Sequence, residues 1–150
     1  MNKREIKSVA EMSQLAAEIG QQLRPGMIVY LVGELGAGKT TFVQALARFL
    51  GVSRPVTSSP FVLMSSYVVK NQPVIQKLVH LDLYRLTVQQ VRAELLVQQV
   101  LSTESRVGRV TVVEWADRLD KQATPEGWWI KFEHRDPTTR VVTWEYGPST

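Results

Sequence analysis

Apolar residues recur at helical spacing in two stretches of the first third of the chain. The first stretch follows the capping pair Ser8 and Glu11 and ends before Pro25, so it predicts a helix that packs on a sheet. Its apolar face consists of Met12, Leu15, Ala16, Ile19 and Leu23. The face of the second predicted helix consists of Phe42, Val43, Leu46, Phe49 and Leu50. Gly51 stands where its C-cap is expected, and the apolar run 27–32 between the two helices predicts a buried strand.

The rest of the chain alternates strand-like segments with one more helical stretch. That stretch begins at the capping box Thr87 to Gln90. Two strand-like segments flank the turn-rich tetrad 70–73, so we expect them to form an antiparallel hairpin. The strand-like segments are residues 61–69, 74–83, 109–115, 129–133 and 140–145.

The loop between the first strand and the second helix carries a phosphate-binding motif. Residues 33–40 fit the pattern G-x-x-x-x-G-K-[ST] without a mismatch, and they lie in the strand, loop and helix order that the motif requires. Glycines let successive backbone N–H groups point at an anion, next to the positive end of the following helix. We predict that Lys39 reaches the β and γ phosphates and that the Thr40 hydroxyl binds Mg²⁺. The predicted nucleotide contacts in this loop are Glu34, Leu35, Gly36, Ala37, Gly38, Lys39, Thr40 and Thr41.

Together the elements predict one α/β domain over residues 1–150. A chain of 150 residues with 44% hydrophobic residues can bury one core and leaves little sequence for a second. We predict a P-loop NTPase-like three-layer sandwich with a mixed parallel and antiparallel sheet. Residues 1–7 and 147–150 are expected to fray.

Composition and charge narrow the chemistry. Zero cysteines exclude disulfides and thiolate metal sites. No apolar stretch is long enough for a membrane helix and the polar start lacks the apolar core of a secretory signal, so we expect a cytoplasmic protein. The net charge of +4 arises in residues 1–75, which hold eight Lys and Arg against four Asp and Glu. These charges are scattered and not clustered, so charge alone predicts no nucleic-acid groove, and any direct contact with RNA is expected to be weak.

Two carboxylates follow apolar strands and are candidates for the metal and the hydrolysis. Asp82 comes after the run 78–81 and is our first choice for the Mg²⁺ shell. Glu114 comes after the run 110–113, and it can contact the same metal, hold its water or orient an attacking water as a general base. The alternative is that each acid simply pairs with a nearby arginine.

Several neighbouring side chains are weaker candidates. His80 shares the strand face of Asp82, but a structural role is the more common one for a buried histidine. Arg85 and Arg118 can neutralise a transferring phosphoryl group, although surface arginines are common. Trp115 can stack on adenine, lie in an interface or pack in the core. The adjacent Trp128 and Trp129 face opposite sides of a strand, so we expect at least one to be exposed.

Three motifs in the same order and spacing resemble the TsaE (YjeE) family of bacterial P-loop ATPases. They are residues 33–42, His80-Leu81-Asp82-Leu83-Tyr84-Arg85-Leu86, and Val113-Glu114-Trp115-Ala116-Asp117-Arg118. The resemblance covers roughly residues 8–145. It implies an ATPase required for the threonylcarbamoyl group on adenosine 37 of ANN-reading tRNAs, acting with TsaB and TsaD and in one pathway with TsaC. It also implies that ATP or ADP and Mg²⁺ are the ligands, that Lys39, Asp82 and Glu114 are catalytic, and that Trp115 contacts the nucleotide.

One residue departs from the family pattern. The family usually reads Ser-Pro-Thr-Phe after the P-loop helix, whereas this chain reads Ser58-Ser59-Pro60-Phe61. Because proline offers neither a hydroxyl nor an N–H, any contact from that threonine to phosphate or metal is lost or moved to a neighbouring residue. Hydrolysis is then expected to be slower or gated differently.

Two other functions use the same phosphate site. A small-molecule kinase has the same phosphate cradle, but it needs a lid and an acceptor pocket. A nucleotide-gated interaction module binds ATP or ADP and signals through loop order, with hydrolysis incidental. Pro60 favours the gated module slightly.

Overall fold

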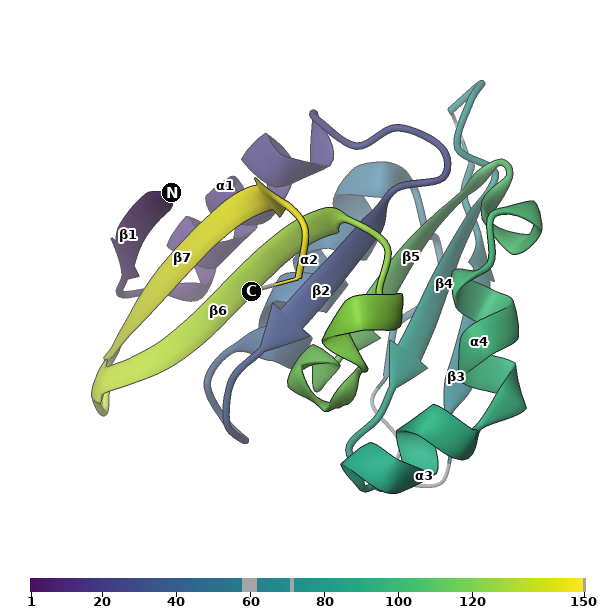
Figure 1. Ribbon diagram of the computed structural model, residues 1–150. Coiled ribbons are helices and arrows are strands. Elements are labelled where there is room, and N and C mark those ends of the chain that lie inside the picture. Colours follow the sequence, from purple (N-terminus) through teal and green to yellow (C-terminus); the bar gives the residue numbers. More distant parts are fainter. Residues whose placement is uncertain (58–61, 71, 150) are drawn as a thin grey trace.

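The computed structural model describes residues 1–57, 62–70 and 72–149. Within them the strands form one mixed sheet in the order β1-β7-β6-β2-β5-β4-β3 (Figure 1). The strands are β1 (Asn2–Ile6), β2 (Ile28–Val32), β3 (Met64–Val68), β4 (Lys77–Asp82), β5 (Arg109–Glu114), β6 (Gly127–Asp136) and β7 (Thr139–Gly147). The helices are α1 (Val9–Gly20), α2 (Lys39–Leu50), α3 (Val88–Ala93) and α4 (Leu95–Leu101), with 3-10 helices η1 (Glu104–Arg106), η2 (Ala116–Arg118) and η3 (Lys121–Ala123).

The centre of the sheet is parallel and its flanks are antiparallel. β2 pairs in parallel with β5 and β6, and β5 pairs in parallel with β4. The antiparallel pairs are β3 with β4, β6 with β7 and β1 with β7. The predicted α/β fold with a mixed sheet is confirmed, including the antiparallel hairpin before Leu83.

Local capping chemistry sets where the helices begin and end. The Ser8 hydroxyl accepts a hydrogen bond from the Glu11 amide at the start of α1, and Thr87 and Gln90 form the predicted capping box of α3. The backbone leaves the helical region at Glu94 (φ −80°, ψ 109°), so two short helices replace the single helix expected there. The Glu94 side chain then caps α4 by accepting from the amide of Leu96.

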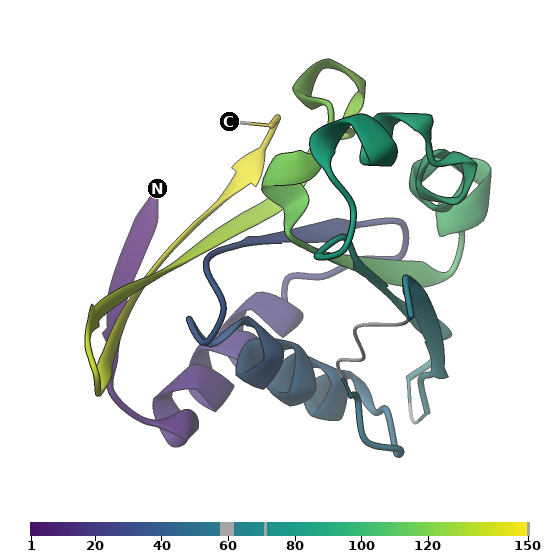
Figure 2. The same ribbon diagram turned by 90° about the horizontal axis from the view of Figure 1, so that it is seen from below.

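Two apolar cores lie on opposite faces of the sheet. Alternate residues of β2 point to opposite sides, so Val29 and Leu31 join α1 and α2, whereas Ile28 and Tyr30 join α3, α4 and η2. Figure 2 shows these helices on the two sides of the sheet. The predicted three-layer sandwich is therefore present. No helix in the described ranges is both long and apolar enough to cross a membrane.

The N-terminal segment is ordered, so its predicted fraying is wrong. β1 pairs with β7 from Asn2 to Ile6, and the Ile6 side chain is buried. A two-pronged ion pair also ties Arg4 to Glu18 of α1, with N–O distances of 3.1 and 2.8 Å. At the other end β7 continues to Gly147, the first residue of the segment 147–150 that was expected to fray.

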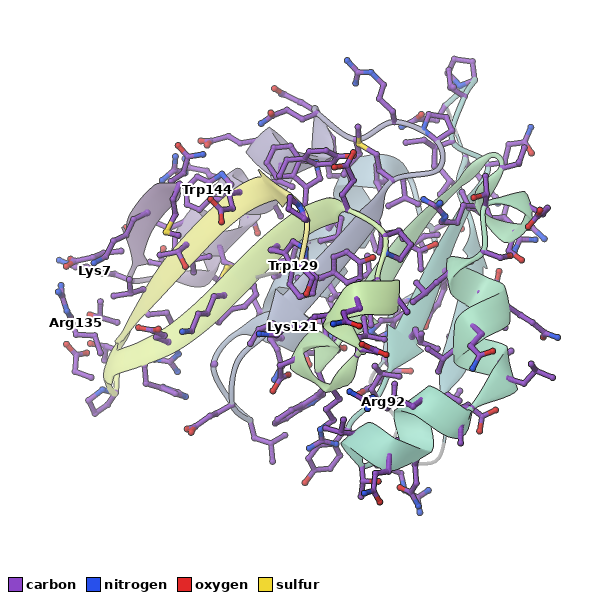
Figure 3. The ribbon with its side chains drawn as sticks, in the orientation of Figure 1. Lys7, Arg92, Lys121, Trp129, Arg135 and Trp144 are labelled. Carbon is purple, nitrogen blue, oxygen red and sulfur yellow. The ribbon has the colours of Figure 1, made fainter. Side chains whose placement is uncertain are left out.

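The adjacent tryptophans of β6 face opposite cores. Trp128 is buried in the core under α1 and α2, while Trp129 is partly buried and stacks on Tyr30 with ring centroids 4.2 Å apart. Figure 3 shows Trp129 on the side of the sheet that carries the 3-10 helices. The two side chains face opposite sides as predicted, but neither is exposed.

Gly51 ends α2 and lies against the backbone of Lys70, and this close contact can be tested by substitution. It has φ +105°, and a Cβ added there would collide with the carbonyl oxygen of Lys70. Gly26 also has a left-handed backbone (φ +93°), but its nearest neighbour, the Arg106 carbonyl oxygen, lies 3.9 Å away. We expect Gly51→Ala to lower the free energy of unfolding by about 1–3 kcal/mol more than Gly26→Ala, in chemical denaturation. Equal losses would show that only backbone strain matters.

Candidate functional site

Three parallel strands end at the same edge of the sheet and bring the predicted site together. β2 leads into the phosphate loop, β4 ends at Asp82 and β5 ends at Glu114. Asp82 lies opposite Glu114 in the register of β4 and β5, and Leu31 of β2 lies opposite Glu114 on its other side. Ligands of open α/β sheets bind outside such carboxyl ends of strands.

The phosphate loop leaves the first amides of α2 available to an anion. Gly38, the N-cap, has φ 108° and makes no side-chain cap hydrogen bond among the described residues, in contrast to the capped α1 and α3. A Cβ at Gly38 would lie 2.9 Å from Cε of Met12, the flexible end of a side chain that can shift, so glycine is required here for its left-handed conformation and not for space. Free amides at the positive end of a twelve-residue helix are suited to phosphate.

The Lys39 side chain is buried beside this loop, with 5% of its surface exposed. Its Nζ donates to the carbonyl oxygens of Gly33 and Glu34 and lies 3.7 Å from the centroid of the Trp115 ring. Burial lowers the pKa of the Lys39 ammonium, while nearby carboxylates, above all Glu114, oppose this effect. The ammonium is thus held by backbone carbonyls and an aromatic face.

One pocket of about 520 Å³ contains most of the predicted residues. Glu34 and Ala37 lie outside this pocket. The Glu34 residue is exposed and lines a second groove with Asp117, whereas Ala37 is buried in the core. The predicted residues that line the pocket are Leu35, Gly36, Gly38, Lys39, Thr40, Thr41, Asp82, Glu114 and Trp115.

The pocket also has walls that the sequence did not reveal. One wall is the start of α1 and the residues before it, and another is the turn between β6 and β7. Arg140 of β7 donates to the Gly36 carbonyl oxygen at 3.3 Å, which joins that turn to the phosphate loop. The additional lining residues are Ile6, Lys7, Ser8, Val9, Met12, Tyr84, Pro137, Thr138 and Arg140. Apart from Tyr84, which lies in the motif 80–86, no functional motif marks them, because the pairing of distant strands brings them to the pocket.

Glu114 is buried and hydrogen-bonded to His80. The Glu114 Oε2 and His80 Nε2 atoms are 2.6 Å apart, and the side chains are 3% and 5% exposed. His80 lies on the face of Asp82, as predicted, and its ring extends to the neighbouring strand. An arginine partner for Glu114, which was the alternative at this position, is not seen among the described residues.

Trp115 and Arg118 lie in the turn after β5 and contact the loop after β4. Trp115 is in the left-handed region (φ 58°), the one non-glycine residue of the described chain with positive φ. Its ring packs against Tyr84 and under the guanidinium of Arg118. Arg118 Nη1 donates to the carbonyl oxygens of Leu83, Tyr84 and Leu86, with distances of 3.0 Å to Leu83 and 2.8 Å to Leu86. Arg118 therefore joins the loop after β4 to the turn after β5.

The donor atoms in the pocket fit Mg²⁺ bound together with a nucleotide. The described residues contain no group of three or more His, Cys, Asp or Glu side chains that could hold a metal ion by themselves. Mg²⁺ does not need such a group, because it keeps several waters and takes one or two carboxylates plus phosphate oxygens. Thr40, Asp82 and Glu114 line one pocket and supply oxygen ligands of this kind.

A model of the family described as threonylcarbamoyl adenosine biosynthesis protein TsaE matches residues 6–142. The chain belongs to the TsaE family. It is 34% identical over 149 residues to a Mycobacterium bovis TsaE protein, and the match covers 96% of this chain and 86% of that protein. A Synechocystis TsaE protein is 40% identical over 106 residues, which cover 71% of this chain and 64% of that protein, slightly less than two thirds of its length.

The fold of this chain is similar to that of a solved structure. This chain superposes on the crystal structure of Bacillus subtilis YdiB with a TM-score of 0.70 at 28% identity, and the match covers 95% of this chain and 83% of the YdiB chain. The departure from the TsaE motif at Pro60 lies outside the described residues, so its consequence stays a prediction.

Arg118 provides a test of how the site is supported. We expect Arg118→Ala to lower the free energy of unfolding by about 1–3 kcal/mol, because three carbonyl groups lose a charged donor. Arg92→Ala is the matched control: its guanidinium is 60% exposed and 3.9 Å from Asp120, so its loss should change stability by less than about 0.5 kcal/mol. Chemical denaturation measures both. Equal stability of the two variants would show that the carbonyl contacts do not support the loops.

Proposed function

We propose that this TsaE-family chain is a Mg²⁺-dependent ATPase that acts with TsaB and TsaD in forming threonylcarbamoyladenosine in tRNA. The observation that supports it best is one pocket in which a buried lysine and an uncapped helix start face two strand-end carboxylates. That arrangement supplies a phosphate cradle, oxygen ligands for a cation and a candidate general base. Membership of the TsaE family supports the role in threonylcarbamoyladenosine biosynthesis, and the residues of the pocket support the proposed hydrolysis of ATP.

Each residue then has a defined role. The amides of the phosphate loop and the Lys39 ammonium bind the β and γ phosphates, and Lys39 gives up its carbonyl contacts to do so. Thr40 and Asp82 would hold Mg²⁺, which supplies charge neutralisation at the phosphates when it is bound. Glu114 orients the attacking water or accepts its proton. Trp115, directly over Lys39, lies at the phosphate end of the pocket and not at a base-binding end.

The remaining walls of the pocket suit the nucleoside. Val9 and Met12 present apolar surface to the pocket, while Ser8 and Thr138 offer polar atoms. The base and ribose would then bind between the start of α1 and the β6–β7 turn, and both segments would contact the nucleoside. The phosphates would then lie toward β4 and β5, next to both acids.

Steady-state phosphate release from ATP and Mg²⁺ tests the proposal, first with the purified protein and then with TsaB and TsaD from the same organism. The proposal expects slow release alone and faster release with the partners. Consumption of ATP only with a phosphate acceptor would instead indicate a kinase. Nucleotide-dependent binding of the partners without acceleration would indicate a gated module.

Lys39→Ala should lower the rate of phosphate release by on the order of a hundredfold or more, because the phosphates lose their buried cation. Lys77→Ala is the control, since Lys77 is exposed at the start of β4, the end of the strand away from the pocket. The same assay measures both variants. A Lys39→Ala rate equal to that of the control would remove lysine from the mechanism.

Asp82→Ala should raise the Mg²⁺ concentration needed for half-maximal phosphate release, because the metal loses a carboxylate ligand. Titration of Mg²⁺ at fixed ATP measures this, and circular dichroism checks that the fold is kept. Unchanged Mg²⁺ dependence would transfer the metal role to Glu114.

A further inference from the structure

A buried hydrogen bond joins side chains of the parallel strands β4 and β5, and one of its two residues lines the phosphate pocket. His80 Nε2 and Glu114 Oε2 are 2.6 Å apart, and neither side chain exposes more than 5% of its surface. Glu114 lines the phosphate pocket, whereas His80 does not. His80 therefore contacts the pocket through Glu114.

The strand register dictates this contact. His80 lies opposite Val112, and Asp82 lies opposite Glu114. His80 is therefore two residues before Asp82 along β4 and on the same face of the sheet as the two acids. The side chain at this place reaches diagonally to the end of β5. Leu78, the preceding residue on this face of β4, and Val112 of β5 are in the apolar core under α1 and α2.

The proposed role of Glu114 sets the direction of the hydrogen bond. A general base is an ionised carboxylate, which only accepts hydrogen bonds, so under the proposed function the His80 Nε2 atom carries the proton. Oε2 of Glu114 is thereby occupied. The other carboxylate oxygen, Oε1, is the one left for a partner in the pocket.

We propose that His80 is a positioning residue, which holds Glu114 by this hydrogen bond so that Oε1 faces the water to be activated. The role rests on the proposed function. Stability gives no comparable reason for a histidine here, because a buried polar or ionic pair can usually be replaced by packed apolar residues without loss. An orienting hydrogen bond behind a catalytic group, in contrast, is a common feature of active sites.

The first test needs no nucleotide. Nitrogen-15 NMR of the imidazole rings distinguishes the Nε2–H form from the Nδ1–H form, and the chain has only two histidines to assign. The proposal expects His80 to carry a proton on Nε2 in the wild type. A neutral ring with its proton on Nδ1 would overturn it.

The second test separates positioning from structural support. We compare His80→Phe, which removes the donor, with His80→Gln, which can supply an N–H, and with Thr111→Val as the control. Thr111 is buried on β5 but points to the face opposite Glu114. The readouts are kcat for ATP, Kd for ADP and the thermal midpoint.

His80→Phe should lower kcat about 10- to 100-fold, the usual range for a lost orienting partner. Its Kd for ADP should match that of Thr111→Val, its thermal midpoint should fall because the buried Glu114 carboxylate loses its donor, and His80→Gln should recover part of kcat. In a Glu114→Gln background, His80→Phe should cause little further loss, because both changes remove one function.

Two results would overturn the positioning role alone. One is an unchanged kcat in His80→Phe, and the other is a loss of ADP affinity that parallels the loss of kcat and that His80→Gln does not restore, which a structural role predicts. Absence of turnover in the wild type, alone and with TsaB and TsaD, would overturn the proposed function and this role together.

Discussion

The parallel alignment of β2, β5 and β4 is the constraint on which the whole site depends. Each strand ends at the same edge, and the register places Asp82 directly opposite Glu114, next to the strand that feeds the phosphate loop. A slip of one residue in either strand would turn its acid to the other face of the sheet. The buried apolar residues of these strands, packed against helices on both faces, make such a slip costly. Core packing thus sets the geometry of the charged site.

Patterns confined to a short stretch of chain could be predicted from the sequence. The strand, glycine loop and helix around Lys39 carry their own signals, and so do the caps at Ser8 and Thr87. The two acids were found because each follows an apolar run. β1 was missed, because Asn2 to Glu5 are polar and largely exposed, and contacts with distant segments, above all the pairing with β7, order them.

What the sequence could not give was contact between distant segments. The His80–Glu114 hydrogen bond depends on the register of two strands that are 34 residues apart in the chain. Arg118 was considered for its charge, yet its partners are backbone carbonyls, which no side-chain pattern reveals. Likewise, Arg140 reaches Gly36 only because the long hairpin of β6 and β7 bends back to the phosphate loop. Such contacts follow from topology, so the structure was needed to find them.

The placement of positive charge bears on how this site would be activated. Arg118 is held by three carbonyl oxygens, and Arg140 by those of Gly36, Asp136 and Pro137. Moving Arg118 to a phosphate would leave the partly buried carbonyls of Leu83 and Leu86 without a charged donor, at a cost of about 1–3 kcal/mol for each group left unsatisfied, whereas the Arg140 contacts are exposed and water can replace them. Lys39 is also occupied by carbonyls, but it lies at the helix start where phosphate would replace them. Lys39, Arg118 and Arg140 are therefore engaged with backbone carbonyls, and under the proposed function intrinsic turnover is slow until a partner supplies charge or rearranges these loops.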